Sequence, residues 1–102
     1  MKKDIIPVIF RKFKEGDIIA LFPSLPADMK YNNCTSYMHI GQHSAASINI
    51  IGNTKPATQQ EYKPLYDELV NIVEYDNLKV YQKKQNWMDK ERIDYIKNNW
   101  ER

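Results

Sequence analysis

The side chains best suited to chemistry lie within one short segment of this 102-residue chain. Cys34, His39 and His43 are the single cysteine and both histidines, and Ser44 follows directly. An imidazole that takes the proton of a neighbouring thiol or hydroxyl turns it into a nucleophile, so these four residues are candidates for nucleophilic catalysis. Cys34 equally fits a small buried apolar residue, the commoner role of a single cytoplasmic cysteine.

The spacing of the same residues also bears on metal binding. His39 and His43 are four residues apart and would share one face of a helix. The sequence lacks the glutamate of the His-Glu-x-x-His zinc motif, and Gly41 interrupts the would-be helix. We therefore predict no bound metal and no cofactor.

The small polar run that follows is a candidate ligand site. Residues 41–47 resemble a glycine-led turn that enters a short helix, whose free N–H groups would attract an anion. Neither G-x-G-x-x-G nor G-x-x-x-x-G-K-[ST], the nucleotide-binding patterns, is present. The alternative is a tight connection whose small residues let the chain pass close to a sheet. The candidate ligand-binding residues are Tyr37, His39, Gly41, Gln42, His43 and Ser44.

The C-terminal region offers a third kind of chemistry. Basic and aromatic side chains alternate there, as in surfaces that contact phosphates and stack on bases. The candidates for nucleic-acid binding are Lys79, Tyr81, Lys83, Lys84, Trp87 and Arg92. Asp89, Glu91 and Asp94 lie among them, which equally suits an ion-paired helix surface. The isoelectric point of about 8.6 is below the value above 9 that marks a strong basic footprint.

Aromatic residues are numerous, with seven tyrosines, two tryptophans and three phenylalanines. Tyr62 and Tyr66 fall on the apolar side of a predicted helix and indicate packing. Tyr81, Tyr95 and Trp100 have no such obvious place in a core. An exposed aromatic patch favours a protein partner or self-association.

The elements that must position these residues begin with a hairpin. Residues 5–13 and 17–22 are apolar and rich in β-branched side chains, and a turn containing Gly16 separates them. Pro23 and Pro26 predict the end of the second strand, because proline has no N–H to donate. Beyond them we expect a short strand over residues 37–40, a helical turn within 42–47 and a strand over 48–51.

The second half of the chain is more regular. Thr58 and Glu61 form a capping-box pattern, and the apolar spacing after it predicts a helix over residues 59–74. We further predict a strand over 78–83 and a helix over 89–98, with Ile93, Ile96 and Trp100 on one stripe. The order β-β-loop-α-β-α predicts one α+β domain over residues 1–102, a small antiparallel sheet with the long helix packed across it.

Composition narrows the class of protein. Apolar residues make up 42% of the chain, charged residues 27%, and the net charge is +2, which argues against a disordered chain. No apolar run reaches the roughly 18 residues of a membrane span. The N-terminal apolar stretch is too short for a secretory signal, so we expect a cytoplasmic protein. One cysteine cannot build a disulfide framework.

Three segments resemble a small uncharacterised family of bacterial and mobile-element or phage proteins. They are PVIFRKFKEGDIIALFP at residues 7–23, SYMHIGQHSAA at 36–46 and TKPAT at 54–58. The resemblance implies a bacterial or phage cytoplasmic origin and marks the histidine segment as a family signature. It implies no activity and no catalytic residue.

Without a complete catalytic or cofactor motif, the sequence favours a non-catalytic binding or regulatory module. Its surplus of aromatic residues indicates a protein partner or self-association. Two alternatives stay open. One is a small enzyme or anion-binding domain that uses Cys34, His39, His43 and Ser44, and the other is a nucleic-acid-binding protein.

Overall fold

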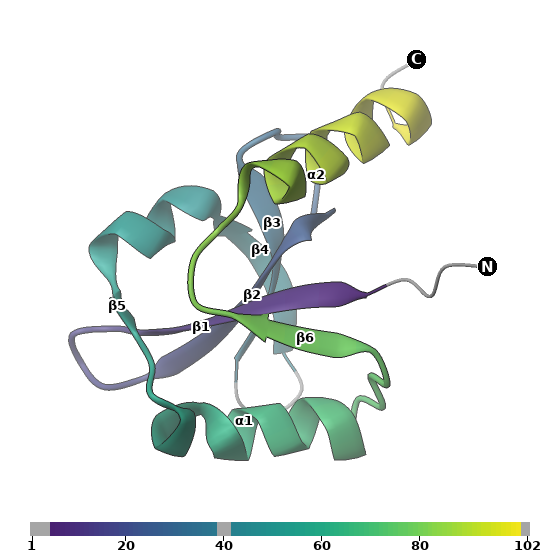
Figure 1. The fold of residues 1–102 in the computed structure, drawn as a ribbon. Coiled ribbons are helices and arrows are strands. Elements are labelled where there is room, and N and C mark those ends of the chain that lie inside the picture. Colours follow the sequence, from purple (N-terminus) through teal and green to yellow (C-terminus); the bar gives the residue numbers. More distant parts are fainter. Residues whose placement is uncertain (1–4, 39–41, 101–102) are drawn as a thin grey trace.

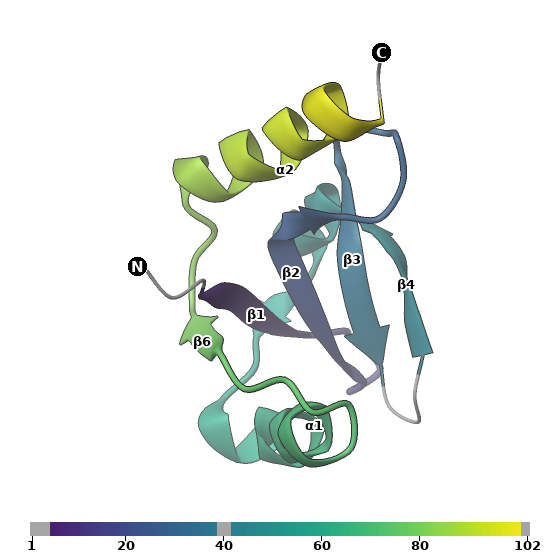
Figure 2. The same ribbon diagram turned by 90° about the vertical axis from the view of Figure 1, so that its right-hand side faces the viewer.

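The structure is a computed structural model that describes residues 5–38 and 42–100. These residues form an α+β fold whose two helices lie on opposite sides of the strands (Figures 1 and 2). In chain order the elements are β1 (Ile6–Lys12), β2 (Ile18–Pro26), β3 (Asn33–Met38), β4 (Gln42–Ser47), the 3-10 helix η1 (Ile48–Asn53), β5 (Lys55–Pro56), α1 (Gln59–Asn71), β6 (Leu78–Tyr81) and α2 (Asn86–Asn99).

The N-terminal hairpin forms the centre of the sheet. β1 and β2 pair antiparallel, with Phe10 opposite Ala20, and Gly16 takes a φ of 101° in the connecting turn. Side chains of a strand alternate between its two faces, and both faces of this hairpin are covered, which explains its continuous apolar run. The predicted hairpin is therefore confirmed.

The full sheet has the order β4-β3-β2-β1-β5, with β6 beside the first half of β1. All pairs are antiparallel except β1 with β6, which run parallel. The predicted antiparallel sheet is thus correct for five strands and not for the sixth. β5 runs antiparallel to β1 and β6 runs parallel to it, so the chain reverses direction between the two strands that α1 connects.

The sequence led us to expect that β2 would end at its first proline, Pro23, but the strand continues beyond it. It continues to Pro26, and its pairing with β3 shifts between Phe22 and Pro26. Such an irregularity accommodates residues that cannot donate to the ladder. Pro26 still accepts a hydrogen bond at its carbonyl from Thr35 Oγ1, at 3.0 Å.

Two predictions in the middle of the chain are wrong. Residues 42–47 form strand β4 rather than a helical turn, because pairing with β3 outweighs the local preference of two alanines. Residues 48–51 belong to η1 rather than a strand, and the side chain of Ser47 caps η1 by accepting from the N–H of Asn49. We expected a strand over residues 37–40, and β3 covers residues 33–38, so the two ranges share residues 37 and 38. His39 and Ile40 lie outside the described residues.

α1 closes one face of the sheet. Its capping box is present as predicted, with Thr58 Oγ1 accepting from the N–H of Glu61 at 3.2 Å and Glu61 Oε1 accepting from the N–H of Thr58 at 2.9 Å. Leu65 and Leu69 are buried against the sheet, and the ring of Tyr62 stacks on that of Phe10 at 4.3 Å. The helix ends at residue 71, somewhat before its predicted limit of 74.

The opposite face holds a second, smaller core. Ile19, Leu21, Cys34 and Ala46 are buried there beneath the isoleucines of η1. The guanidinium of Arg11 fixes this cover, because its Nε donates to Thr54 Oγ1 at 3.0 Å and its Nη2 to the carbonyl of Ile51 at 2.8 Å.

α2 packs against the end of β2 through Met88, Arg92 and Ile96, all of which are at most 1% exposed. These residues are spaced by four and form one stripe. The predicted stripe was different: Ile96 is buried, but Ile93 is only half-buried and Trp100 is exposed. Arg92 takes the central place because its Nη1 donates to the carbonyl of Pro23 at 2.6 Å and its Nε to that of Tyr31 at 2.8 Å.

Arg92→Ala should lower the free energy of unfolding by about 3–5 kcal/mol. It leaves the carbonyls of Pro23 and Tyr31 without their donor and removes one of the two cations paired with Asp89, whose Oδ1 is 2.9 Å from Nη1. Urea denaturation followed by circular dichroism measures the change. Lys90→Ala removes an exposed ion pair from the same helix and should change the stability little. A loss below 1 kcal/mol for Arg92→Ala would contradict this role.

Glu61→Gln should reduce the loss of stability in acid. The hydrogen bond from Lys12, followed by that from Thr58, lowers the pKa of Glu61 from 4.5 to about 2. A lowered carboxylate pKa stabilises the fold above pH 4.5, and this contribution is lost as the pH falls towards 2. Glutamine preserves the capping box but carries no charge. Denaturation at several pH values should therefore show a flatter profile for the variant, and an unchanged slope would refute the coupling.

Candidate binding groove

The histidine segment does not assemble the predicted catalytic group within the described residues. His43 and Ser44 are consecutive in β4, so their side chains project from opposite faces of the sheet. His43 lies on the face of α1, with its ring 4.8 Å from that of Tyr37 and its Nε2 3.2 Å from the hydroxyl of Tyr75. Ser44 lies on the other face, with its Oγ 3.2 Å from that of Ser36.

Cys34 belongs to the second core rather than to a reactive site. Its side chain is fully buried, and it pairs with Ala46 on β4. Burial raises the pKa of this thiol to about 11, so almost none of it is thiolate near neutral pH. Cys34 and His43 also lie on opposite faces of the sheet, which separates the proposed nucleophile from the proposed base.

Residues 42–47 also lack the helical turn on which the anion-binding prediction was based. They form a strand paired with β3, and the short helix η1 begins only after Ser47, its N-cap. Of the other candidates in this segment, Tyr37 is buried, and Gln42 begins β4. His39 and Gly41 lie outside the described residues. Among residues 5–38 and 42–100, no group of three or more His, Cys, Asp or Glu side chains is placed to hold a metal ion.

The basic and aromatic candidates separate into two groups. Arg92 is 1% exposed and its guanidinium donates to two backbone carbonyls, so its assignment to a nucleic-acid surface is wrong. A charged side chain can be buried when hydrogen bonds to such carbonyls replace its contacts with water. Lys84 forms a hydrogen-bonded ion pair with Asp89. Lys79 lies over the ring of Tyr81, with Nζ 5.3 Å from the ring centroid. Lys83 is exposed.

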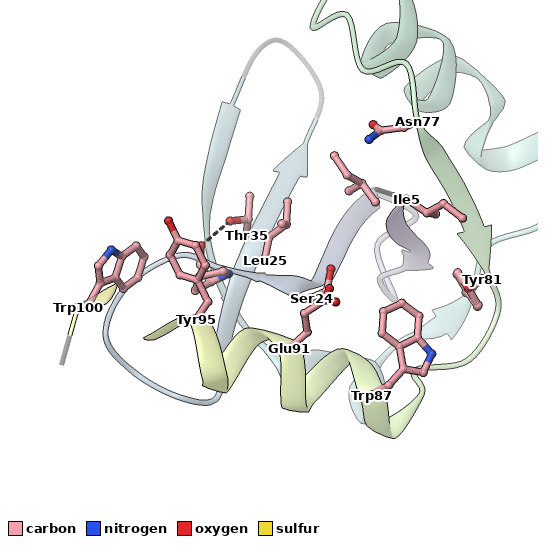
Figure 3. A pocket seen from close by; sticks show the side chains of 12 residues that line it. Ile5, Ser24, Leu25, Thr35, Asn77, Tyr81, Trp87, Glu91, Tyr95 and Trp100 are labelled. Atoms are coloured by element: carbon pink, nitrogen blue, oxygen red, sulfur yellow. Dashed lines mark hydrogen bonds between the residues drawn. The ribbon is translucent and has the colours of Figure 1, made fainter. Parts of the chain in front are cut away.

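Tyr81 and Trp87 form one end of a groove between α2 and the strands (Figure 3). Their rings meet edge to face at 6.2 Å. Tyr95 and Trp100 form a second edge-to-face pair at 5.5 Å. The groove has a volume of about 980 Å³. Its walls also include Ile5, Ile6, Ser24, Leu25, Pro26, Thr35, Asn77 and Glu91.

The spacing of residues along α2 explains how this helix forms one wall of the groove. Trp87, Glu91 and Tyr95 are four residues apart and lie beside the buried stripe of the same helix. In Figure 3 their side chains rise from α2 towards the strands that form the opposite wall. The exposed fractions of Trp87, Tyr95 and Trp100 are 41%, 48% and 39%, which is high for such large apolar side chains.

The polar groups of the groove are few and mostly paired. Thr35 donates its hydroxyl to the carbonyl of Pro26, and the carbonyl of Asn77 accepts from the N–H of Ile6 at 2.9 Å. Ser24 is 5% exposed. Among the described residues that line the groove, Glu91 is the one charged side chain, and it lies between the two aromatic pairs (Figure 3). The groove therefore combines apolar ends with a negative centre.

Sequence reasoning named only Tyr81 and Trp87 of this groove as site residues. Tyr95 has no obvious place in a core, and its four-residue spacing from Glu91 and Trp87 is the signal that could have placed it beside them. Trp100 continues the spacing of the buried stripe, so its position in the helix gave no such signal. Ile5 and Leu25 gave no such signal, because each continues an apolar strand.

Within the described ranges, no helix is long and apolar enough to cross a membrane.

The thiol of Cys34 should react with Ellman's reagent at least about 100-fold more slowly in the folded protein than in urea at pH 8, because its raised pKa lowers the thiolate fraction. The colour reaction reports this residue alone, since it is the only cysteine. Rapid labelling of the folded protein would show that the thiol is accessible and would reopen its candidacy as a nucleophile.

No protein-family model, curated protein or solved structure matches the chain. The resemblance to a bacterial and phage family stays a prediction. The groove between α2 and the strands is therefore the feature from which a function can be inferred.

Proposed function

We propose that this protein is a non-catalytic binding module that holds a peptide segment of a protein partner in the groove between α2 and the strands. The observation that carries the proposal is the convergence of two aromatic pairs, Tyr81 with Trp87 and Tyr95 with Trp100, on one groove of about 980 Å³. Tryptophan and tyrosine dominate the binding energy of protein interfaces, where they fill apolar pockets. Following the sequence-based expectation, the partner is a cytoplasmic protein of a bacterium or phage.

The arrangement of α2 specifies the ligand. Trp87 and Tyr95 are eight residues apart, which is about 12 Å along a helix. An extended peptide advances about 3.3 Å per residue, so its residues i and i+4 span nearly the same distance. Residues i, i+2 and i+4 of that peptide point to one side. A matching segment has apolar side chains at i and i+4 and a lysine or arginine at i+2, opposite Glu91.

The charges of the groove favour a peptide over a nucleic acid. Glu91, the single charged residue in the part of the lining that the structure describes, would repel phosphate groups. Arg92 is buried and Lys84 is paired with Asp89, which removes two of the four cations that the nucleic-acid interpretation needs. Lys79 and Lys83 lie outside the lining.

The described residues also weaken the enzyme alternative. A nucleophile needs a base within hydrogen-bonding distance. Cys34 is buried on one face of the sheet, His43 lies on the other, and Ser44 projects away from its neighbour His43. We therefore assign no catalytic residue.

The test is a displayed library of five-residue peptides with leucine at positions 1 and 5, lysine at position 3 and random residues between. Selected peptides should change the tryptophan fluorescence, because both tryptophans of the chain line the groove. Trp87→Ala should weaken binding at least tenfold, since buried tryptophan anchors contribute about 2 kcal/mol or more. Ile72→Ala, at an apolar residue that is 73% exposed outside the groove, should leave affinity unchanged.

A charge exchange sharpens the result. Glu91→Lys should weaken the lysine peptide at least fivefold and instead favour a peptide with glutamate at position 3. Equal binding by the parent protein, Trp87→Ala and Glu91→Lys would contradict the proposal. Preferential binding of a single-stranded oligonucleotide, with an affinity that falls steeply with salt, would support the nucleic-acid alternative instead.

A further inference from the structure

β4 is the outermost strand of the sheet, and Figure 2 shows its far side facing away from the rest of the described fold. The hydrogen bond from the N–H of Ile48 to the carbonyl of Asn32, 2.7 Å long, fixes the phase of the β3–β4 ladder. Bonded and non-bonded pairs alternate along antiparallel strands. The backbone groups of Ser44 and Ala46 therefore face β3, whereas those of His43, Ala45 and Ser47 point outward.

The two edges of the sheet differ in how they discourage pairing with other chains. Natural edge strands carry lysine, proline, bulges or a covering element for this purpose. The opposite edge has such features, since β5 consists of Lys55 and Pro56 and β6 contains Lys79. β4 is six residues long, contains no charged residue and no proline, and pairs with β3 in unbroken register.

We propose that β4 pairs with β4 of a second copy of this chain and joins the two sheets into one. An antiparallel pair related by a two-fold axis places Ala45 opposite Ala45 of the second copy and His43 opposite Ser47. The outward backbone groups then form about six hydrogen bonds across the interface. This is a surface and a partner separate from the peptide groove.

The side chains of β4 suit a partner of identical sequence. Like charges directly opposite one another destabilise strand pairs, and an identical strand presents every charge to itself. In the two-fold register, Ser44 faces Ala46 and Ala45 faces itself, so these central neighbours are small and uncharged, and the larger His43 faces the small Ser47. His43 is held over the α1 face by its contacts with Tyr37 and Tyr75, which leaves the edge open.

The decisive substitution is Ala45→Pro. Because the N–H of Ala45 points outward, proline removes a donor from the proposed interface but none from the β3–β4 ladder. Ala45→Lys is the second variant and introduces like charges at the two-fold axis. Gln60→Lys, on the exposed surface of α1, is the matched control for added charge.

Analytical ultracentrifugation of the full chain at several concentrations gives the result. The parent protein and Gln60→Lys should form dimers with twice the mass of a 12.1 kDa chain. Both Ala45 variants should raise the dimer dissociation constant at least tenfold, with unchanged circular dichroism. A parent protein that stays monomeric up to millimolar concentration overturns the proposal, as do Ala45 variants that dimerise normally. Dissociation by Trp87→Ala alone would assign the dimer to the groove and would likewise overturn it.

Discussion

The buried guanidinium of Arg92 is the interaction on which the position of α2 depends. Residues 23–25 of β2 fall within the shift of the β2–β3 pairing, so the carbonyl of Pro23 has no place in the ladder. A buried carbonyl without a donor costs free energy, and Arg92 supplies that donor. Its second bond, to the carbonyl of Tyr31, ties the loop before β3 to the same helix. One cation thus satisfies the irregular end of the sheet and docks α2 there.

The groove follows from how little of α2 is buried. Met88, Arg92 and Ile96 form a narrow contact stripe, and the adjacent stripe of Trp87, Glu91 and Tyr95 stays open towards the strands. A helix docked by a wider apolar face would have covered these aromatic side chains. These aromatic side chains are therefore exposed because α2 contacts the sheet through a narrow stripe. The proposed peptide would bury them.

The predictability of this fold from sequence varied with the strength of local signals. Strict features, such as the β-branched runs of β1 and β2 and the capping box of Thr58, predicted their elements correctly. β4 contains only small or polar side chains that do not alternate between apolar and polar, so its sequence alone does not predict a strand. It is a strand because it pairs with β3, and that pairing cannot be read from the sequence. Arg92 was misassigned because its carbonyl partners lie 61 and 69 residues away along the chain.

The candidate site was harder to predict than the fold. The histidine segment attracted attention through residue type and closeness in sequence, yet strand geometry directs His43 and Ser44 to opposite faces. The groove is assembled from five separate parts of the chain, around Ile5, Leu25, Thr35, Asn77 and α2. Only the aromatic surplus of the C-terminal region signalled its presence, and it could not show which rings share a surface.

Chemical-shift mapping by nuclear magnetic resonance tests the central claim most directly. The indole N–H groups of Trp87 and Trp100, which lie at the two ends of the groove (Figure 3), should give two separate signals. When a selected peptide is titrated in, both signals should shift together with backbone amides of α2 and of Ser24 and Leu25. Shifts confined to α1 or to β4, with both indole signals unmoved, would contradict the assignment of the groove as the binding surface.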